Sequence, residues 1–229
     1  MKICGLQKLT LLDYPGNLAC TVFLGGCNFK CSYCYNTSLI NPPSEIRTIS
    51  VEELMSFLDK RKGILNGVAI TGGEPLINKD IKDLIFKIRE KGFKVKLDTN
   101  GSFPDVLENL IEEGLVDYVA MDVKNTYEKY SFTAGAKVNI ENISRSINIL
   151  LQGKVDYEFR TTVIKEFHAI DDFEEIGKMI KGAKHYFLQS FQDKDSVHGH
   201  FNAMSKEDLE ACLKKAQLYV PVAKIRGVD

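Results

Sequence analysis

Apolar positions along the chain follow two alternating patterns, which predict strands and helices in regular succession. Short apolar runs typical of buried strands lie at residues 19–24, 68–70, 93–97, 115–123, 157–164 and 185–190. Apolar residues recur every three or four positions, the spacing of one helical face, within residues 51–62, 77–91, 106–111, 143–151, 173–180 and 209–216. In the run at 93–97 lysines alternate with apolar residues, so we expect a strand with one face in solvent.

Two of the helix ends carry local signals. Ser50 and Glu53 have the spacing of a capping box at the start of the helix over 51–62. Gly92 follows the helix over 77–91, where a glycine can take the backbone conformation that ends a helix.

Six strand–helix units in succession predict an α/β fold with a parallel sheet. A closed barrel of eight units typically takes about 250 residues, so six units suit an open, partial TIM-like barrel better. A flat, doubly wound sheet has the same periodicity and stays an alternative. We expect one domain over residues 1–229, with an N-terminal segment at 1–17, a cysteine loop at 25–36 and a C-terminal helix near 205–219.

Glycines and charged residues follow the predicted strands at their carboxyl ends. They are Gly72, Gly73 and Glu74 after the second strand, Asp98 and Thr99 after the third, and Asp122 and Lys124 after the fourth. Parallel α/β folds build their sites on that edge of the sheet. We therefore expect these segments to converge on a single site.

Each of these residues has a chemical use in a binding site. Paired glycines let the backbone approach a ligand closely, and Pro75 biases Glu74 toward an extended backbone. Aspartate carboxylates suit a cationic group, and a lysine suits a carboxylate. Arg160 lies within the strand predicted at 157–164 and needs a partner if its side chain points inward.

The densest chemical signal is a run of three cysteines, Cys27, Cys31 and Cys34, with an aromatic residue, Tyr33, before the last. Iron–sulfur clusters are held by cysteine thiolates, usually four of them. A four-iron cluster on three thiolates keeps one iron open, and an open position on a metal centre is where a ligand can bind.

Cysteines at these spacings also occur in other kinds of site. The pair Cys31 and Cys34 alone would also suit a zinc site or a redox pair. A structural zinc site generally takes a second pair of ligands downstream, whereas Cys212 stands alone and His198 and His200 flank a glycine. Six cysteines in 229 residues are too sparse for a disulfide framework. We expect Cys4, Cys20 and Cys212 to be buried.

Composition narrows the class of protein. A net charge of −1 gives no electrostatic signature for nucleic acid or for an anionic membrane. The sequence shows no signal peptide and no segment able to span a bilayer. Together with the free thiols, this predicts a cytoplasmic protein with no nucleic-acid or membrane partner.

The cysteine run and the Gly-Gly-Glu segment resemble those of the radical S-adenosylmethionine (SAM) enzymes. Within that superfamily the chain is most similar to the activating enzymes of glycyl-radical enzymes, along essentially its full length. The resemblance also includes the segments 10–16 and 98–101 and the pair Asp122 and Lys124. The opening segment looks like that of the anaerobic ribonucleoside-triphosphate reductase activating proteins.

This resemblance implies cofactors and residue roles. It implies a [4Fe–4S] cluster on Cys27, Cys31 and Cys34, whose open iron chelates the methionine part of SAM. The implied SAM contacts are Tyr33 near the adenine, Asn36 near the ribose, Lys124 at the carboxylate, and Gly72, Gly73, Glu74, Asp98 and Asp122 at the amino end, with Arg160 a further candidate. Asp98, Thr99 and Asp122 are implied candidates for a monovalent cation.

The implied activity is reductive cleavage of SAM to form a radical that abstracts a hydrogen atom from a glycine of a partner enzyme. A flavodoxin or ferredoxin would supply the electron. The alternatives are a radical SAM enzyme acting on a small molecule, an activase of another glycyl-radical enzyme such as pyruvate formate-lyase, and a non-catalytic metal-binding module. Tyr35, where this subgroup usually has histidine, and Tyr14 in the Asp-Tyr-Pro-Gly segment depart from the family pattern.

Overall fold

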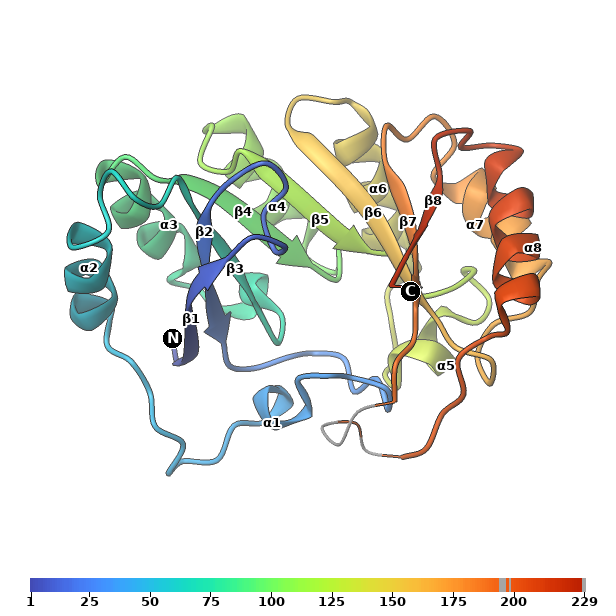
Figure 1. Ribbon diagram of the computed structural model, residues 1–229, viewed down its shortest axis with the longest axis horizontal. Coiled ribbons are helices and arrows are strands. Elements are labelled where there is room, and N and C mark those ends of the chain that lie inside the picture. Colours follow the sequence, from blue (N-terminus) through green and yellow to red (C-terminus); the bar gives the residue numbers. More distant parts are fainter. Residues whose placement is uncertain (194–196, 198, 228–229) are drawn as a thin grey trace.

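The computed structural model describes residues 1–193, 197 and 199–227 and contains one curved sheet of eight strands in sequence order (Figure 1). The strands are β1 (Ile3–Thr10), β2 (Ala19–Leu24), β3 (Gly67–Gly72), β4 (Lys94–Thr99), β5 (Tyr118–Asp122), β6 (Asp156–Val163), β7 (Tyr186–Ser190) and β8 (Lys224–Arg226). β1 is antiparallel to β2, and all later neighbours are parallel. Within the described residues β1 and β8 do not pair, so the barrel stays open.

Helices connect the parallel strands and cover the outer face of the sheet (Figure 1). The longer ones are α2 (Val51–Asp59), α3 (Ile81–Glu90), α4 (Pro104–Glu112), α6 (Ile140–Leu151), α7 (Asp172–Met179) and α8 (Lys206–Gln217). The short ones are α1 (Thr37–Ile40), α5 (Tyr130–Ala134) and the 3-10 turn η1 (Pro75–Ile77). In the described part of the chain no helix is long and apolar enough to cross a membrane.

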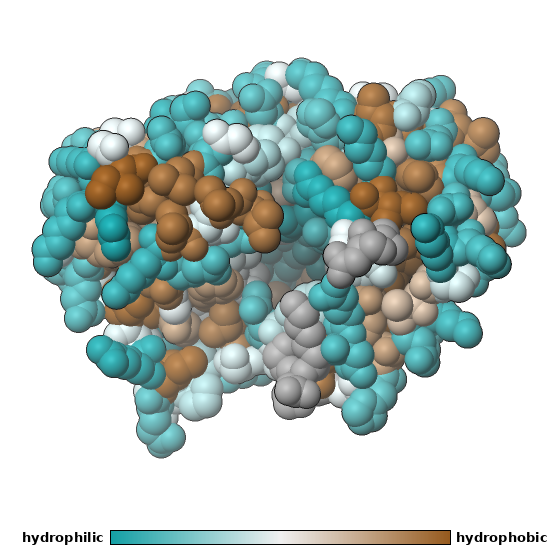
Figure 2. Space-filling model, in the orientation of Figure 1, coloured by the Kyte–Doolittle hydropathy of each residue, from teal (hydrophilic) through white to brown (hydrophobic). Residues whose placement is uncertain are grey.

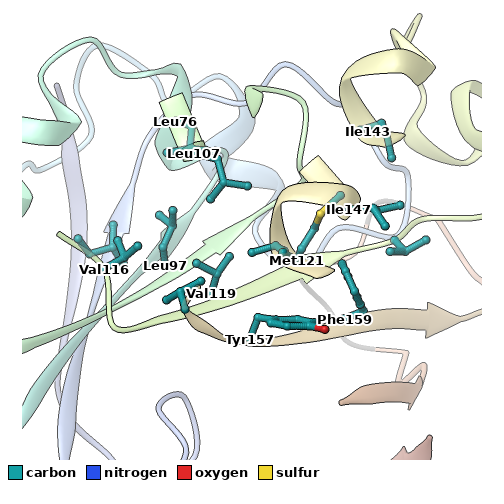
Figure 3. Close-up of a cluster of buried hydrophobic side chains, with 14 of the residues drawn as sticks. Leu76, Leu97, Leu107, Val116, Val119, Met121, Ile143, Ile147, Tyr157 and Phe159 are labelled. Atoms are coloured by element: carbon teal, nitrogen blue, oxygen red, sulfur yellow. The ribbon is translucent and has the colours of Figure 1, made fainter. Parts of the chain in front are cut away.

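The hydrophobic core lies between these helices and the outer face of the sheet. Figure 3 shows Leu107 of α4 and Ile147 of α6 above Leu97, Val119 and Met121 of the sheet, and all five side chains are almost completely buried. Burial of each such side chain stabilises the fold by roughly 1.5–3 kcal/mol. Since neighbouring strand residues point to opposite faces, this packing directs the alternate residues of β4–β6 into the barrel.

The prediction of an open, partial barrel is confirmed, and two strands are added to it. β1 escaped the sequence pattern because its middle residues are partly or fully exposed. β8 has only three residues and follows β7 after α8. The capping box is confirmed, since Ser50 Oγ accepts a hydrogen bond from the Glu53 amide and a Glu53 carboxylate oxygen accepts one from the Ser50 amide.

Two local predictions are wrong. The helix expected over 77–91 begins only at Ile81, because the chain first makes the turn η1, in which Ile77 is exposed. The strand expected over 93–97 does not keep one face in solvent. Lys96 is only 2% exposed and points into the barrel, where it forms an ion pair with Asp98.

Candidate active site

A cavity of about 600 Å³ opens on the inner face of the sheet, next to the cysteine loop and the carboxyl ends of the strands. Figure 2 shows the surface hollowed between the two halves of the molecule. The cavity is lined by Cys27, Cys31, Tyr33, Cys34, Asn36, Gly72, Gly73, Asp98, Thr99, Asp122, Lys124 and Arg160. Every predicted site residue except Glu74 therefore lies on one wall or another of this cavity.

The cysteine loop is fixed from several sides. Asn36 Nδ2 donates to the carbonyl oxygen of Gly72 at 3.2 Å, which ties the loop to the end of β3. The amide of Lys30 donates to the carbonyl oxygen of Ala134 at 2.9 Å, which ties it to α5. Gly135 has a φ of +61°, and a Cβ atom there would lie 2.3 Å from the Lys30 carbonyl oxygen. This glycine is required by the close approach of α5 to the loop, which no short-range sequence pattern indicates.

The two glycines after β3 bring the backbone against the cysteine loop. A Cβ atom at Gly73 would lie 2.1 Å from the Gly26 carbonyl oxygen, and one at Gly72 would lie 2.3 Å from that of Leu24. The amide of Glu74 donates to the same Gly26 oxygen at 2.8 Å. The glycines thus allow two backbone segments to meet at the cavity, where both glycines are also part of the wall.

Glu74 differs from the expectation for a residue that touches the cofactor. Its carboxylate accepts hydrogen bonds from the Leu76 amide at 3.1 Å, the Thr99 hydroxyl at 2.9 Å and the Asn100 amide at 2.7 Å. The residue is 1% exposed, and burial raises its pKa to about 7. These hydrogen bonds give Glu74 a structural role, because they join the end of β3 to the end of β4.

The inner faces of β4, β5 and β6 carry a charged cluster, which we define as Lys96, Asp98, Asp122, Lys124 and Arg160. Arg160 lies between the two aspartates, with Nε 2.9 Å from Asp122 Oδ1 and Nη1 3.5 Å from Asp98 Oδ2. Lys124 Nζ is 2.9 Å from the other Asp122 oxygen, and Lys96 pairs with Asp98. Arg160 therefore points inward and has the partners that its position in a strand required.

The two carboxylates of the cluster are ionised at neutral pH. Burial alone would raise the pKa of Asp122, but Arg160 and Lys124 hold that pKa well below its usual value. For Asp98, Arg160 and Lys96 likewise outweigh burial and lower the pKa. The negative charges of both carboxylates are thus already balanced by lysine and arginine side chains of the chain. Binding of a monovalent cation beside Asp98, Thr99 and Asp122 stays a prediction.

The three thiols fit a cluster better than a single ion. Burial raises the pKa of the Cys27 thiol to about 11 and also raises that of Cys31, so metal binding must displace their protons. Among the described residues, no three His, Cys, Asp or Glu side chains are placed to hold one metal ion. A four-iron cluster spreads its ligands over several irons, and all three thiols face the same cavity.

Cys4, Cys20, Cys212 and His200 do not line the cavity. Cys20 and Cys212 are completely buried, and Cys212 Sγ lies 3.5 Å from Met204 Sδ. Cys4, by contrast, is partly exposed. The side chain of His200 is fully exposed beside Asp193, and His198 lies outside the described residues.

Sequence reasoning missed the part of the cavity that β6, β7 and β8 form. Thr162, Gln189, Ser190 and Arg226 line it. Ser190 ends a predicted strand, so the rule that sites lie at carboxyl strand ends could have found it. Tyr35 was noted only as a departure from a family pattern. Its hydroxyl accepts a hydrogen bond from the Gln192 amide at 2.9 Å, and its ring stacks on Phe191.

Comparison with known proteins adds independent information on this site. Residues 21–180 match the radical SAM superfamily. Over 99% of its length the chain is 34% identical to a protein of Methanocaldococcus jannaschii assigned as a glycyl-radical enzyme activating enzyme, and the match covers 96% of that protein. In fold it is similar to a radical SAM methyltransferase from Sphaerobacter thermophilus, with a TM-score of 0.71 at 18% identity over 95% of this chain and 68% of that one.

Two further relatives match over about half of the chain. A 7-carboxy-7-deazaguanine synthase from Methanopyrus kandleri is 34% identical over 48% of this chain and 51% of its own length. The pyruvate formate-lyase-activating enzyme of Clostridium pasteurianum is 29% identical over 54% of this chain and 52% of its own length. The name of the first relative refers to a small-molecule product, and the name of the second refers to a protein target.

Proposed function

The chain belongs to the radical SAM superfamily and, within it, to the glycyl-radical enzyme activating enzymes, and we propose that its partner is an anaerobic ribonucleoside-triphosphate reductase. As a radical SAM enzyme it uses a [4Fe–4S] cluster and SAM. When bound, the reduced cluster supplies the electron that cleaves SAM to methionine and a 5′-deoxyadenosyl radical. A hydrogen atom then passes from the glycine α-carbon of the partner to the 5′ carbon, which leaves the glycyl radical.

Cys27, Cys31 and Cys34 are the proposed cluster ligands. They are the cysteines that line the cavity, and the loop that carries them is held by β3 and α5. Three thiolates leave the fourth iron for SAM. The carboxylates of Asp98 and Asp122 are the proposed partners of the SAM amino group, and Lys124 is the proposed partner of its carboxylate. Arg160 keeps the two aspartates ionised and in place.

Asn36, Tyr33 and the glycine pair complete the proposed SAM site. The side chain of Asn36 already holds the cysteine loop to Gly72, so a ribose contact would use its remaining amide capacity. Tyr33 is almost completely buried and packs on Phe167 with ring centroids 5.5 Å apart. It therefore gives the adenine side of the site a rigid apolar wall.

The full-length similarity to a glycyl-radical enzyme activating enzyme carries the family assignment. The choice of a ribonucleotide reductase as the partner rests on the opening segment, which resembles that of the anaerobic ribonucleoside-triphosphate reductase activating proteins. The similarity to a 7-carboxy-7-deazaguanine synthase favours a second candidate, a radical SAM enzyme that acts on a small molecule. The electron donor, a flavodoxin or ferredoxin, and a location in the cytoplasm stay predictions.

Electron paramagnetic resonance separates the two candidates. The reconstituted, reduced and SAM-loaded protein is mixed with the anaerobic ribonucleotide reductase encoded in the same genome. We expect a stable glycyl-radical doublet on the reductase, and deuterium placed on the target glycine should appear in 5′-deoxyadenosine. A small metabolite that gives up its label while the reductase stays silent would support the second candidate.

A further inference from the structure

The segment that follows β5 carries Lys124 to the cavity from a position beyond the paired part of the sheet. β5 pairs with β6 as far as Asp122 and Arg160, and the Val123 amide then donates to the Arg160 carbonyl oxygen at 2.8 Å. Lys124 follows this last hydrogen bond and still lines the cavity. Its main chain must therefore be held by other groups if its ammonium group is to stay in place.

Three buried side chains hold the main chain of this segment. The hydroxyl groups of Tyr130 and Thr161 donate to the carbonyl oxygens of the two residues before Lys124, at 3.3 and 2.7 Å. His168 Nε2 lies 2.9 Å from the carbonyl oxygen of Lys124 itself. All three of these side chains are almost completely buried. Since a buried carbonyl group needs a hydrogen-bond partner, these donors fix the course of the main chain.

The surroundings of His168 determine which of its ring nitrogens carries the proton. A carbonyl oxygen only accepts, so the contact with Lys124 requires a proton on Nε2. Nδ1 lies 3.2 Å from both the amide nitrogen and the carbonyl oxygen of Ile164, and that oxygen already accepts hydrogen bonds from the amides of Phe167 and His168. Nδ1 therefore accepts from the Ile164 amide, and the imidazole is neutral. Burial, which lowers the pKa of His168, favours the same state.

We propose that His168 is a positioning residue for SAM, which holds the main chain of Lys124 and thereby the ammonium group that would bind the SAM carboxylate. This inference rests on the proposed role of Lys124 and adds a residue that does not itself line the cavity. The Lys124 side chain is largely buried, with Nζ 2.9 Å from an Asp122 oxygen. Because it cannot swing through solvent, a shift of its main chain would move Nζ as well.

The first test compares three replacements of His168, with the SAM Kd of the cluster-loaded protein measured by equilibrium dialysis. His168→Phe keeps a ring without a donor, and His168→Asn keeps an acceptor near Nδ1 but does not reach Lys124. Each should raise the SAM Kd about three- to tenfold. His168→Gln places its amide nitrogen near the position of Nε2 and should keep the SAM Kd within about twofold of the wild-type value.

The matched control is a lost hydrogen bond at the other end of β6. The Tyr157 hydroxyl accepts from the Lys184 amide at 3.3 Å, and its side chain is almost completely buried. Tyr157→Phe should reduce the free energy of unfolding, measured with urea, but leave the SAM Kd unchanged. A rise in the SAM Kd in Tyr157→Phe as large as that in His168→Phe would show that general loosening of the fold is enough, and the inference would be wrong.

A double-mutant cycle tests whether His168 acts through Lys124. In protein that already carries Lys124→Ala, His168→Phe should change the SAM Kd by less than about twofold, because the group that it positions is gone. An equal rise with and without Lys124 would overturn the inference, as would a His168→Gln variant that binds SAM no better than His168→Asn. Should His168→Phe fail to fold, the comparison of those two variants still decides the case.

Failure of the inference and failure of the proposed function give different results. A SAM Kd that stays at the wild-type value in both His168→Phe and His168→Asn refutes the positioning role, even if a glycyl-radical doublet forms on the reductase. An unchanged SAM Kd in Lys124→Ala also refutes it, because His168 would then have no SAM contact to position. The proposed function fails on a separate observation, the absence of that doublet with the wild-type protein.

Discussion

Two regions lie side by side on the inner face of one sheet, yet their polar groups are satisfied in opposite ways. One is the charged cluster, and the other is the neutral wall, which we define as Thr162, Gln189 and Ser190 of β6 and β7. In the charged cluster, Asp122 has two cationic partners and Arg160 bridges two carboxylates. In the neutral wall, the side chains of Gln189 and Thr162 have no hydrogen-bond partner among the described residues.

The difference indicates two kinds of ligand contact. Buried charges must be paired because an uncompensated charge in a protein interior is costly, so a charged ligand enters the cluster by exchanging partners that are already in place. Uncharged hydroxyl and amide groups can wait in a solvent-filled cavity at little cost. A charged cofactor would therefore bind at the cluster by replacing existing ion pairs, whereas the wall has no such pairs to break.

The largest expected effect concerns the three thiols that line the same cavity. Replacing Cys27, Cys31 or Cys34 with alanine should abolish the four-iron cluster, because each replacement removes one of the three proposed protein ligands. Iron and sulfide analysis of anaerobically reconstituted protein measures this, with about four of each expected per wild-type chain. The matched Cys20→Ala and Cys212→Ala variants should keep the cluster. Loss of the cluster in Cys212→Ala but not in Cys34→Ala would refute the ligand assignment.

The next effect tests whether pairing holds the charged cluster together. Arg160→Met leaves Asp98 and Asp122 with one cation fewer in a buried setting and should lower the free energy of unfolding by about 3–5 kcal/mol. Urea unfolding followed by circular dichroism measures it. Arg145→Met is the control, because Arg145 pairs with Asp105 and Glu108 on the exposed surface, where solvent screens such pairs. An equal loss of unfolding free energy in both variants would show that the buried ion pairs of the cluster stabilise the fold no more than exposed ones do.

A smaller effect separates cofactor binding from stability. Lys124→Ala and Asp122→Ala each remove a charged contact and should weaken SAM binding by about 1.5–3 kcal/mol, measured by equilibrium dialysis with the cluster loaded. Lys215 is partly exposed and pairs only with Asp171 and Glu174 in the described structure, so the control variant Lys215→Ala should bind SAM as the wild type does. Unchanged affinity in both cluster variants would remove the end of β5 from the SAM site.

Acid should weaken the contrast between the two regions. The pKa values of Asp98 and Asp122 are lowered in the folded protein below the usual value of an aspartate, so their contribution to stability is complete above the pKa values of the unfolded chain. It is lost as the pH falls toward the folded pKa values. The stability difference between wild type and Arg160→Met should therefore shrink from pH 7 to pH 3. A difference that grows with acid would mean that Arg160 does not act through these carboxylates.

Local spacing was enough to find much of this site from the sequence. The cysteines, the glycine pair and the strand-end aspartates are recognisable because each motif spans only a few residues, and the order of strands then brings them to one edge. Glu74 shows the limit of that reasoning. Its position after the glycines can be read from the sequence. Its hydrogen bonds from the Thr99 hydroxyl and the Asn100 amide depend on how the ends of β3 and β4 meet in the fold.

The part of the cavity that β6, β7 and β8 form could not be found in the same way. Arg226 lies on a strand of three residues, which is too short to show an alternating pattern of apolar residues. Its ion-pair partner Glu158 is 68 positions away in the sequence. Lys96 was expected in solvent because it alternates with apolar residues. The curvature of the sheet places that face inside the open barrel, where Lys96 pairs with Asp98.

The smallest expected effect concerns Tyr35, which ties the cysteine loop to the segment after β7. Tyr35→Phe keeps a ring to stack on Phe191 but removes the hydroxyl that accepts a hydrogen bond from the Gln192 amide. The unfolding free energy should fall by about 0.5–1.5 kcal/mol, and hydrogen exchange at the Gln192 amide should accelerate. Tyr35→Ala also loses the stacking and should cost more. If Tyr35→Phe leaves that amide as protected as before, the two sides of the cavity are held together by the stacked rings rather than by the hydrogen bond.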